Sequence, residues 1–362
     1  MHKHLLTWFS IHREDLPWRQ DRDPYRVWLS EIMLQQTQVV TVIPYYQRFL
    51  AAYPTVHDLA GASLDDILKL WEGLGYYSRA RNLHRAAQVV VQEHHGKFPS
   101  TVAGLQSLPG IGPYTAGAIA SIAFGLDAPV VDGNVIRVLA RWFDLADDVT
   151  QTKTKKDLWQ RAESLLPSGK AGDWNEALMQ LGQQICTPKQ PDCTNCPVKT
   201  WCKAHQAGTQ LERPIKKRKA PTPHYDVAAG VIRRGADEIL IAQRPLDGML
   251  GGLWEFPGGK REAGESLEAC LVREVQEELG IQISVEQQLA TIKHAYTHFK
   301  ITLYAFECRY LSGEPQAIGC ADWTWTTLES LDQFAFPVTD QQIITTLRSG
   351  GGQLAMDLPP HT

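Results

Sequence analysis

The sequence lacks an apolar run long enough to cross a bilayer, and its first residues lack the apolar segment expected of a signal peptide. Its longest apolar run, AGAIASIAFGL at residues 116–126, is far shorter than the roughly 20 residues that a transmembrane helix needs. The opening MHKHLLTWFSIHREDLPW has no extended apolar stretch, and no low-complexity tract or short repeat is present. We therefore expect a globular cytoplasmic protein without a membrane partner. Its 362 residues suffice for two domains.

The charge of the chain is low overall but unevenly distributed. Residues 1–220 carry 26 Lys and Arg against 21 Asp and Glu, whereas residues 221–362 carry 10 against 19. A basic portion followed by an acidic one indicates two modules with different partners.

The hydrophobic period changes along the chain. Residues 24–186 place apolar residues at a spacing of three to four in successive segments, which is typical of amphipathic helices. Later, VAAGVIRRGADEILIAQR predicts a strand, a turn and a strand, and ITLYAFECRYL predicts another strand beside one helix over 267–280. We therefore expect an all-α domain over residues 1–205 and an α+β domain over residues 226–350.

A basic segment lies between the two expected domains. Residues 205–224, HQAGTQLERPIKKRKAPTPH, contain three prolines and a cluster that includes Lys216, Lys217, Arg218 and Lys219. This composition favours an extended, exposed linker over residues 206–225. The cluster is either a solvated charge run or a contact to a nucleic-acid backbone.

Cysteine is scarce, but four of the seven cysteines lie close together. Cys186, Cys193, Cys196 and Cys202 have the spacing C-x6-C-x2-C-x5-C. Four thiolates this close in a cytoplasmic chain favour a metal site over disulfides. Zinc and an iron–sulfur cluster both remain open from the spacing alone.

The segment LPGIGPYTAGAI, from Leu108, is typical of a helix–hairpin–helix. Gly110 and Gly112 permit a tight turn and expose backbone N–H groups to a phosphate at a helix N-terminus. The alternative is an ordinary turn between helices.

Several segments together carry a family resemblance. The hairpin, VDGNVIRVLAR and the four-cysteine segment resemble the helix–hairpin–helix, endonuclease III-like DNA glycosylases. Four more segments narrow the resemblance to the MutY family of adenine DNA glycosylases: LPWR (16–19), WLSEIMLQQTQV (28–39), GLGYYSRARNLH (73–84) and WNEALMQLG (174–182). The resemblance covers nearly the whole chain. It implies that the four cysteines, in a loop over 186–202, hold a [4Fe-4S] cluster.

The resemblance also implies a reaction. The family excises adenine mispaired with 8-oxoguanine, or with guanine, from double-stranded DNA in base excision repair. Glu31 lies on an otherwise apolar helix, where burial would keep its carboxyl protonated as a general acid, unless it is a surface residue. The resemblance makes it the acid that protonates N7 of the extruded adenine. Asp132 is either a helix N-cap or the carboxylate that stabilises the sugar cation, or both, with Tyr114 and Asn134 in support.

Position 114 distinguishes two reaction types. Relatives that also cut the DNA strand carry a lysine there, whose amine forms a Schiff base with the sugar, whereas a phenol cannot. We therefore predict a monofunctional glycosylase.

The resemblance further implies a pocket for the extruded adenine and residues that insert into the duplex as a wedge. The pocket is formed by Leu16, Trp18, Arg19 and Glu176, and the wedge by Gln36 and Tyr76. Tyr76 and Tyr77 could instead be core aromatics.

The C-terminal domain resembles the Nudix fold, which in this family reads 8-oxoguanine. The loop HAYTHF (294–299) resembles the family's recognition loop, with Tyr296, Thr297 and His298 at the motif positions. The hydroxyl of Thr297 permits a hydrogen bond to the oxidised base. The alternative is an ordinary polar hairpin.

The segment GGKREAGESLEACLVREVQEELGI, residues 258–281, matches the Nudix box at every position. In Nudix hydrolases Glu274, Glu277 and Glu278 would bind Mg²⁺ at a diphosphate. The chain is therefore either a monomeric glycosylase, in which the Nudix box has only a structural role, or a bifunctional protein. In the second case it would also hydrolyse 8-oxo-dGTP or a related nucleoside diphosphate derivative.

Overall fold

The computed structural model describes residues 1–217 and 221–349, and the backbone of residues 355–357. It forms two compact units, Met1–Gly61 with Asn82–Lys219, and Ala62–Arg81 with Ala220–Thr362. Arg218 and Lys219 of the basic cluster lie outside the described residues. No helix among the described residues is long and apolar enough to cross a membrane.

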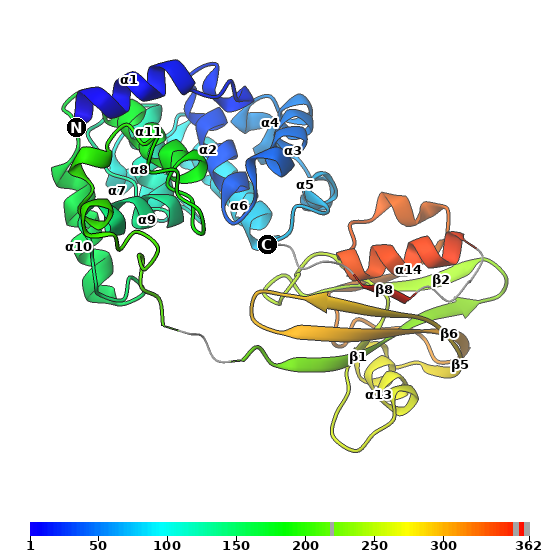
Figure 1. Ribbon diagram of the computed structural model, residues 1–362. Coiled ribbons are helices and arrows are strands. Elements are labelled where there is room, and N and C mark those ends of the chain that lie inside the picture. Colours follow the sequence, from blue (N-terminus) through cyan, green and yellow to red (C-terminus); the bar gives the residue numbers. More distant parts are fainter. Residues whose placement is uncertain (218–220, 350–354, 358–362) are drawn as a thin grey trace. The chain divides into compact units, whose positions relative to one another are not determined.

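The first unit is all-α, as the apolar spacing predicts (Figure 1). Its helices are α1 (His2–His12), η1 (Pro17–Arg19), α2 (Pro24–Leu34), α3 (Val39–Ala52), α4 (Val56–Gly61), most of α6 (Ser78–His94), α7 (Val102–Gln106), α8 (Pro113–Ile122), α9 (Gly133–Trp142), α10 (Thr152–Ser164), α11 (Ala171–Gln184), η2 (Lys199–Trp201) and α12 (Lys203–Ala207).

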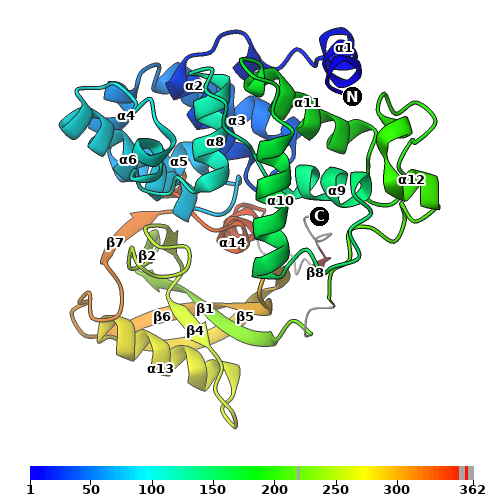
Figure 2. The ribbon, with the colours of Figure 1, turned by 90° about the vertical axis from the view of Figure 1, so that its left-hand side faces the viewer.

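Helix α8 lies in the middle of the first unit (Figure 2). It is buried from Thr115 to Ile122 and contacts α2, α7 and α11. Its sequence, PYTAGAIASI, is rich in small side chains, which let neighbouring helices approach closely. The residues expected to do chemistry lie on α2, at the start of α8, at the start of α9 and on α11. Packing around α8 therefore brings them together.

The start of the predicted linker is folded against the first unit. Arg213 pairs with Asp144 at 2.9 Å, and the Val149 N–H donates to the Ile215 carbonyl at 3.1 Å. The buried Arg141 donates to the Gln210 carbonyl at 2.7 Å. Residues 209–215 therefore differ from the exposed chain that their composition predicts, because buried groups bind their backbone.

The second unit contains a mixed sheet with the strand order β3-β2-β1-β6-β5-β8, and with β4 on β1 and β7 on β2. The central pair, β1 (His224–Arg234) and β6 (Lys300–Ser312), is parallel, whereas β5 (Gln282–Ala295) and β6 form an antiparallel hairpin. The other strands are β2 (Glu238–Gln243), β3 (Trp254–Glu255), β4 (Gly258–Lys260), β7 (Asp322–Thr327) and β8 (Ala355–Asp357).

Each face of this sheet has its own core and helix (Figure 1). One core includes Ile343 and Ile344 of α14 (Val338–Arg348), and the other includes Leu271 and Val275 of α13 (Leu267–Leu279). The predicted helix and the three predicted strands are confirmed. The unit also contains η3 (Ser330–Gln333) and α5 (Leu64–Trp71), and the hydrophobic pattern did not predict that α5 would group with the C-terminal residues.

Candidate active site

Glu31 is a buried carboxyl on a helix that is otherwise almost entirely apolar. Helix α2 begins after Asp23, whose side chain accepts a hydrogen bond from the Arg26 N–H at 3.0 Å, as N-cap residues do. Glu31 lies two turns further and is 5% exposed. Burial raises the pKa of Glu31 to about 7, and the nearby charge of Asp132 acts in the same direction. The expected burial of Glu31 is therefore confirmed.

Tyr114 holds one oxygen of this carboxyl. Its hydroxyl donates to Glu31 Oε2 at 2.6 Å and also lies 3.2 Å from the Met179 sulfur. Burial raises the pKa of Tyr114 well above the ordinary tyrosine value, with a further contribution from the charge of Glu31. Tyr114 is therefore a neutral phenol that orients Glu31.

Asp132 is the N-cap of α9, and its side chain is also held toward the site. One oxygen accepts from the Val135 N–H at 2.7 Å and the other from Asn134 Nδ2 at 2.9 Å. Burial raises the pKa of Asp132, whereas these hydrogen bonds lower it. The N-cap reading is confirmed, and it is compatible with a catalytic carboxylate because the same bonds fix the orientation of the group.

Arg137, which the sequence did not single out, connects this site to the cysteine loop. Its guanidinium donates to Asn134 Oδ1 at 2.8 Å, to the Gly182 carbonyl at 2.7 Å and to the Cys186 carbonyl at 2.7 Å. Asn134 in turn holds Asp132. The signal for Arg137 was weak, since an arginine one turn into an amphipathic helix is typical of a solvated face.

We expect Gly182→Ala to destabilise the first unit by about 1–3 kcal/mol, the usual cost of overpacking a core. A Cβ atom at position 182 would lie 2.7 Å from the Cβ of Asn134 and 3.2 Å from its Cα, so α9 and α11 would have to separate. Chemical denaturation measures the loss. Gly61→Ala is the matched control, because a Cβ there meets no atom within 4 Å. Equal effects of the two substitutions would contradict this account.

The predicted adenine pocket contains a buried ion pair. Arg19 Nε lies 2.7 Å from Glu176 Oε1, and their side chains are 10% and 6% exposed. Leu16 and Trp18 are also buried. The structure thus brings Arg19 of η1 and Glu176 of α11 together. The charges of the two residues act on the pKa of Glu31 in opposite directions, Glu176 raising it and Arg19 lowering it.

The predicted DNA-contacting residues lie in tight turns. Gln36 and Tyr76 have positive φ angles of 56° and 49°, which side-chain-bearing residues seldom adopt. Gln36 is exposed and Tyr76 is 42% exposed, whereas the adjacent Tyr77 is 5% exposed and is the core aromatic of the two. In the hairpin, Gly110 has a φ of 75° and Gly112 is the N-cap of α8.

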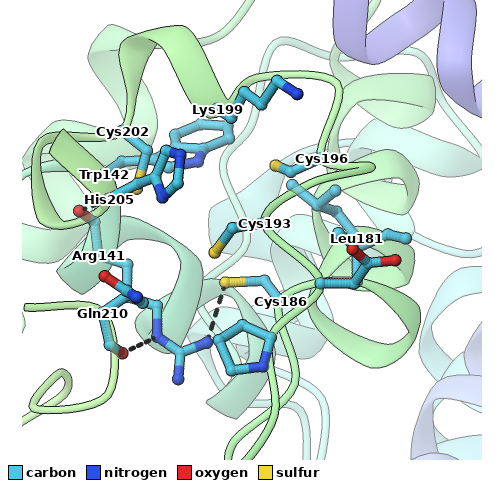
Figure 3. A pocket seen from close by; sticks show the side chains of 13 residues that line it. Arg141, Trp142, Leu181, Cys186, Cys193, Cys196, Lys199, Cys202, His205 and Gln210 are labelled. Atoms are coloured by element: carbon cyan, nitrogen blue, oxygen red, sulfur yellow. Dashed lines mark hydrogen bonds between the residues drawn. The ribbon is translucent and has the colours of Figure 1, made fainter. Parts of the chain in front are cut away.

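All four cysteines of the cluster motif line one pocket. Cys186, Cys193, Cys196 and Cys202 lie around the same space in Figure 3. The buried Arg141 reaches this space and donates to Cys186 Sγ at 3.2 Å. Among the described residues, no three His, Cys, Asp or Glu side chains are grouped so that they could hold one metal ion. The thiols therefore share a pocket without converging on a single point.

In the second unit, the predicted recognition loop joins β5 to β6. The Tyr296 ring packs against the sheet core and lies 5.0 Å from the Phe299 ring. Thr297 and His298 are exposed at the tip. The Thr297 and Tyr76 hydroxyl oxygens are 2.8 Å apart. The loop therefore presents one hydroxyl and one imidazole, while Tyr296 anchors it.

Charged side chains of the Nudix box form ion pairs with one another. Arg273 pairs with Glu265 at 2.8 Å, with Glu274 at 3.0 Å and with Glu277 at 3.2 Å. A Cβ atom at Gly259 would lie 2.2 Å from the Glu274 carboxyl carbon. Burial raises the pKa of Glu278 to about 7. The described side chains, Glu274, Glu277 and Glu278 included, form no three-ligand group, so the expected Mg²⁺ site has no support. The ion pairs of Arg273 give Glu265, Glu274 and Glu277 a structural role.

The chain resembles known proteins over both units. Residues 29–164 match the HhH-GPD superfamily of base excision DNA repair proteins, and residues 228–346 match the NUDIX domain family. A thermostable thymine-DNA glycosylase is structurally similar, with a TM-score of 0.52 and 33% identity, over 57% of this chain and 94% of that one.

Curated relatives match most of the chain. The adenine DNA glycosylase of Rattus norvegicus is 38% identical, over 90% of this chain and 74% of the relative. That of Homo sapiens is 39% identical, over 83% and 65%, and that of Schizosaccharomyces pombe is 30% identical, over 91% and 83%. Each of these matches covers at least 83% of this chain and therefore extends over parts of both units. The chain therefore belongs to the adenine DNA glycosylase family.

Proposed function

We propose that this adenine DNA glycosylase removes adenine paired with 8-oxoguanine, or with guanine, by hydrolysis and leaves an abasic site. The observation that carries this proposal is the group of Glu31, Tyr114 and Asp132. It combines a buried carboxyl, whose pKa burial raises to about 7, with a second carboxylate held by two hydrogen bonds. Such a pair suits cleavage of a glycosidic bond.

Glu31 acts as the general acid. The target adenine must leave the base stack before its N-glycosidic bond is accessible. Glu31 then protonates N7, and the base becomes a better leaving group. A general acid works best with a pKa near the working pH, and burial gives Glu31 a pKa of about 7.

Asp132 stabilises the positive charge that develops on the sugar as the bond breaks. The Val135 N–H and Asn134 keep its oxygens in place, so little reorganisation is needed during the reaction. Water then adds to C1′.

Tyr114 supports a monofunctional reaction. The residue donates to Glu31 at 2.6 Å and carries no amine, so it cannot form an imine with the sugar. We expect incubation with a DNA duplex containing adenine opposite 8-oxoguanine to release adenine and to leave the strand intact until alkali is added. A covalent adduct trapped by borohydride would contradict this proposal.

The rate of base release should fall as pH rises through about 7. The reactive form of Glu31 is protonated, and burial raises its pKa to about 7, so deprotonation above that pH removes the acid. Single-turnover rates across this range measure the effect, with DNA affinity at each pH as the control. A rate that stays constant from pH 6 to about 9 would contradict it.

The loop over 296–298 supports recognition of the oxidised base. Thr297 is exposed, and its hydroxyl, which lies 2.8 Å from the Tyr76 hydroxyl, can donate or accept. Thr297→Val keeps the shape of the side chain, and we expect it to reduce the preference for 8-oxoguanine over guanine by about 2- to 10-fold, the value of one hydrogen bond. Thr345→Val, which removes an exposed hydroxyl on α14, is the control. An unchanged preference would overturn the role of Thr297.

The cysteine pocket supports a [4Fe-4S] cluster held by Cys186, Cys193, Cys196 and Cys202. One zinc ion needs four sulfur atoms at about 2.3 Å from a single point, whereas the irons of a cluster each take one thiolate. The four thiols line one pocket, which supplies one thiolate for each iron of a cluster. When bound, the cluster would cross-link the loop over 186–202. Iron and zinc analysis of the purified protein distinguishes the two readings.

We further infer that the protein acts on double-stranded DNA as a monomer, with Gln36, Tyr76, Gly110 and Gly112 at the DNA. Tight turns with exposed side chains or N–H groups support this assignment. We retain residues 206–225 as the boundary between the domains. No observation favours nucleotide hydrolysis by the Nudix box, and we do not propose it.

A further inference from the structure

Gln180 is a fully buried amide on α11 that the mechanism does not use. It is 0% exposed. Its oxygen accepts from Arg19 Nη1 at 2.8 Å and from the Glu14 N–H at 3.4 Å. Its nitrogen donates to the His12 carbonyl at 2.6 Å and to Gln184 Oε1 at 3.3 Å. Because both the oxygen and the nitrogen of this buried amide are hydrogen-bonded, the side chain is held in one orientation.

Gln180 restrains the guanidinium of Arg19. Gln180 follows Glu176 by four residues, so the two side chains lie on the same face of α11. Glu176 binds Arg19 Nε at 2.7 Å and Gln180 binds Nη1 at 2.8 Å. Two acceptors from one helix therefore hold two different nitrogens of the planar guanidinium, on different sides of the group, and this fixes its orientation as well as its position.

A second cation lies near the other oxygen of Glu176. Arg13 Nη2 lies 3.5 Å from Glu176 Oε2, and its side chain is 39% exposed. Without Gln180, Arg19 would be held by Glu176 and by the Glu14 carbonyl, which accepts from Nη1 at 3.2 Å. The guanidinium would then be less firmly oriented, because Nη1 would keep only this longer bond.

We infer that Gln180 is a positioning residue for base selection, which holds Arg19 beside Glu176 so that this pair reads the hydrogen-bonding edge of the extruded adenine. The inference rests on the proposed function and on the expectation from the family resemblance that Arg19 and Glu176 line the adenine pocket. A guanidinium donor beside a carboxylate acceptor complements a ring nitrogen beside an amino group, which is the pattern of the adenine edge.

The experiment compares two bases in the same DNA duplex, adenine and purine, which lacks the 6-amino group. Single-turnover rates are measured for the full-length protein and for three variants. Gln180→Met has similar length and loses all four hydrogen bonds. Gln180→Glu loses the donor to His12 and to Gln184 but keeps an acceptor for Arg19. Gln184→Met is the matched control, since Gln184 is exposed one turn away and binds Glu14 at 2.6 Å without contacting Arg19.

We expect Gln180→Met to reduce the ratio of adenine to purine release about 10-fold, the effect of one hydrogen bond to a charged group. Gln180→Glu and Gln184→Met should keep the ratio within about threefold of wild type. Thermal unfolding is followed in parallel, because a purely structural role lowers the melting temperature and slows both bases equally.

The outcomes separate this inference from the proposed function. Wild-type protein that releases no adenine overturns the proposed function itself. Wild-type protein that selects adenine, combined with an unchanged ratio in Gln180→Met, overturns only the role of Gln180. Equal loss of selection in Gln180→Met and Gln180→Glu also overturns it, because the shared defect is then the lost bond to His12.

Discussion

Glu31→Gln should slow adenine release by at least about 100-fold, the lower range for loss of a general acid. The amide has nearly the same shape as the carboxyl but no acidic proton. Tyr114 can still donate to the amide oxygen, as it donates to Glu31 Oε2 at 2.6 Å. The substitution therefore removes the proton from the site while the packing around α2 is retained.

Two measurements separate chemistry from binding. Single-turnover excision reports the reaction, and fluorescence anisotropy with the same duplex reports affinity, which we expect to stay within about twofold of wild type. Glu163→Gln is the matched control, because it changes an exposed carboxyl on α10. Unchanged excision by Glu31→Gln would overturn the assignment of the acid.

Much of the first unit was predictable because its signals are local. Apolar spacing predicts the helices, and a lone carboxylate on an apolar helix predicts the burial of Glu31. Gln180 and Arg137 were not predictable in this way. Each is a polar residue on an amphipathic helix, where a solvated side chain is the usual expectation, and only tertiary packing shows that Gln180 is buried and that Arg137 joins α9 to α11.

The second unit shows a different limit. Strand β5 was not predicted, because its pairing with β6 shifts register at three places between Gln282 and Ala290 and the alternation of apolar residues is interrupted. The complete Nudix box was recognised, but a pattern cannot tell a metal site from a scaffold. The ion pairs of Arg273 with Glu274 and Glu277 and the contact of Gly259 with Glu274 give the motif a structural explanation.

Asp132→Asn should slow adenine release by about 1,000-fold without unfolding the protein. A carboxylate about 4 Å from a developing positive charge contributes about 4 kcal/mol at an effective dielectric constant of 20, and the neutral amide loses this term. Asparagine caps helices about as well as aspartate, so the bond from the Val135 N–H, now 2.7 Å, and the start of α9 should be retained.

The comparison with Asp132→Ala tests the two roles of this residue separately. Alanine removes the cap as well as the charge, so it should cost about 1 kcal/mol of stability in addition to the loss of rate. Denaturation and single-turnover excision of both variants are measured together. If Asp132→Asn retains the wild-type rate while Asp132→Ala loses only stability, Asp132 is an N-cap alone and the cation must be stabilised by another group. If both variants lose the rate and only Asp132→Ala loses stability, one carboxylate performs both roles.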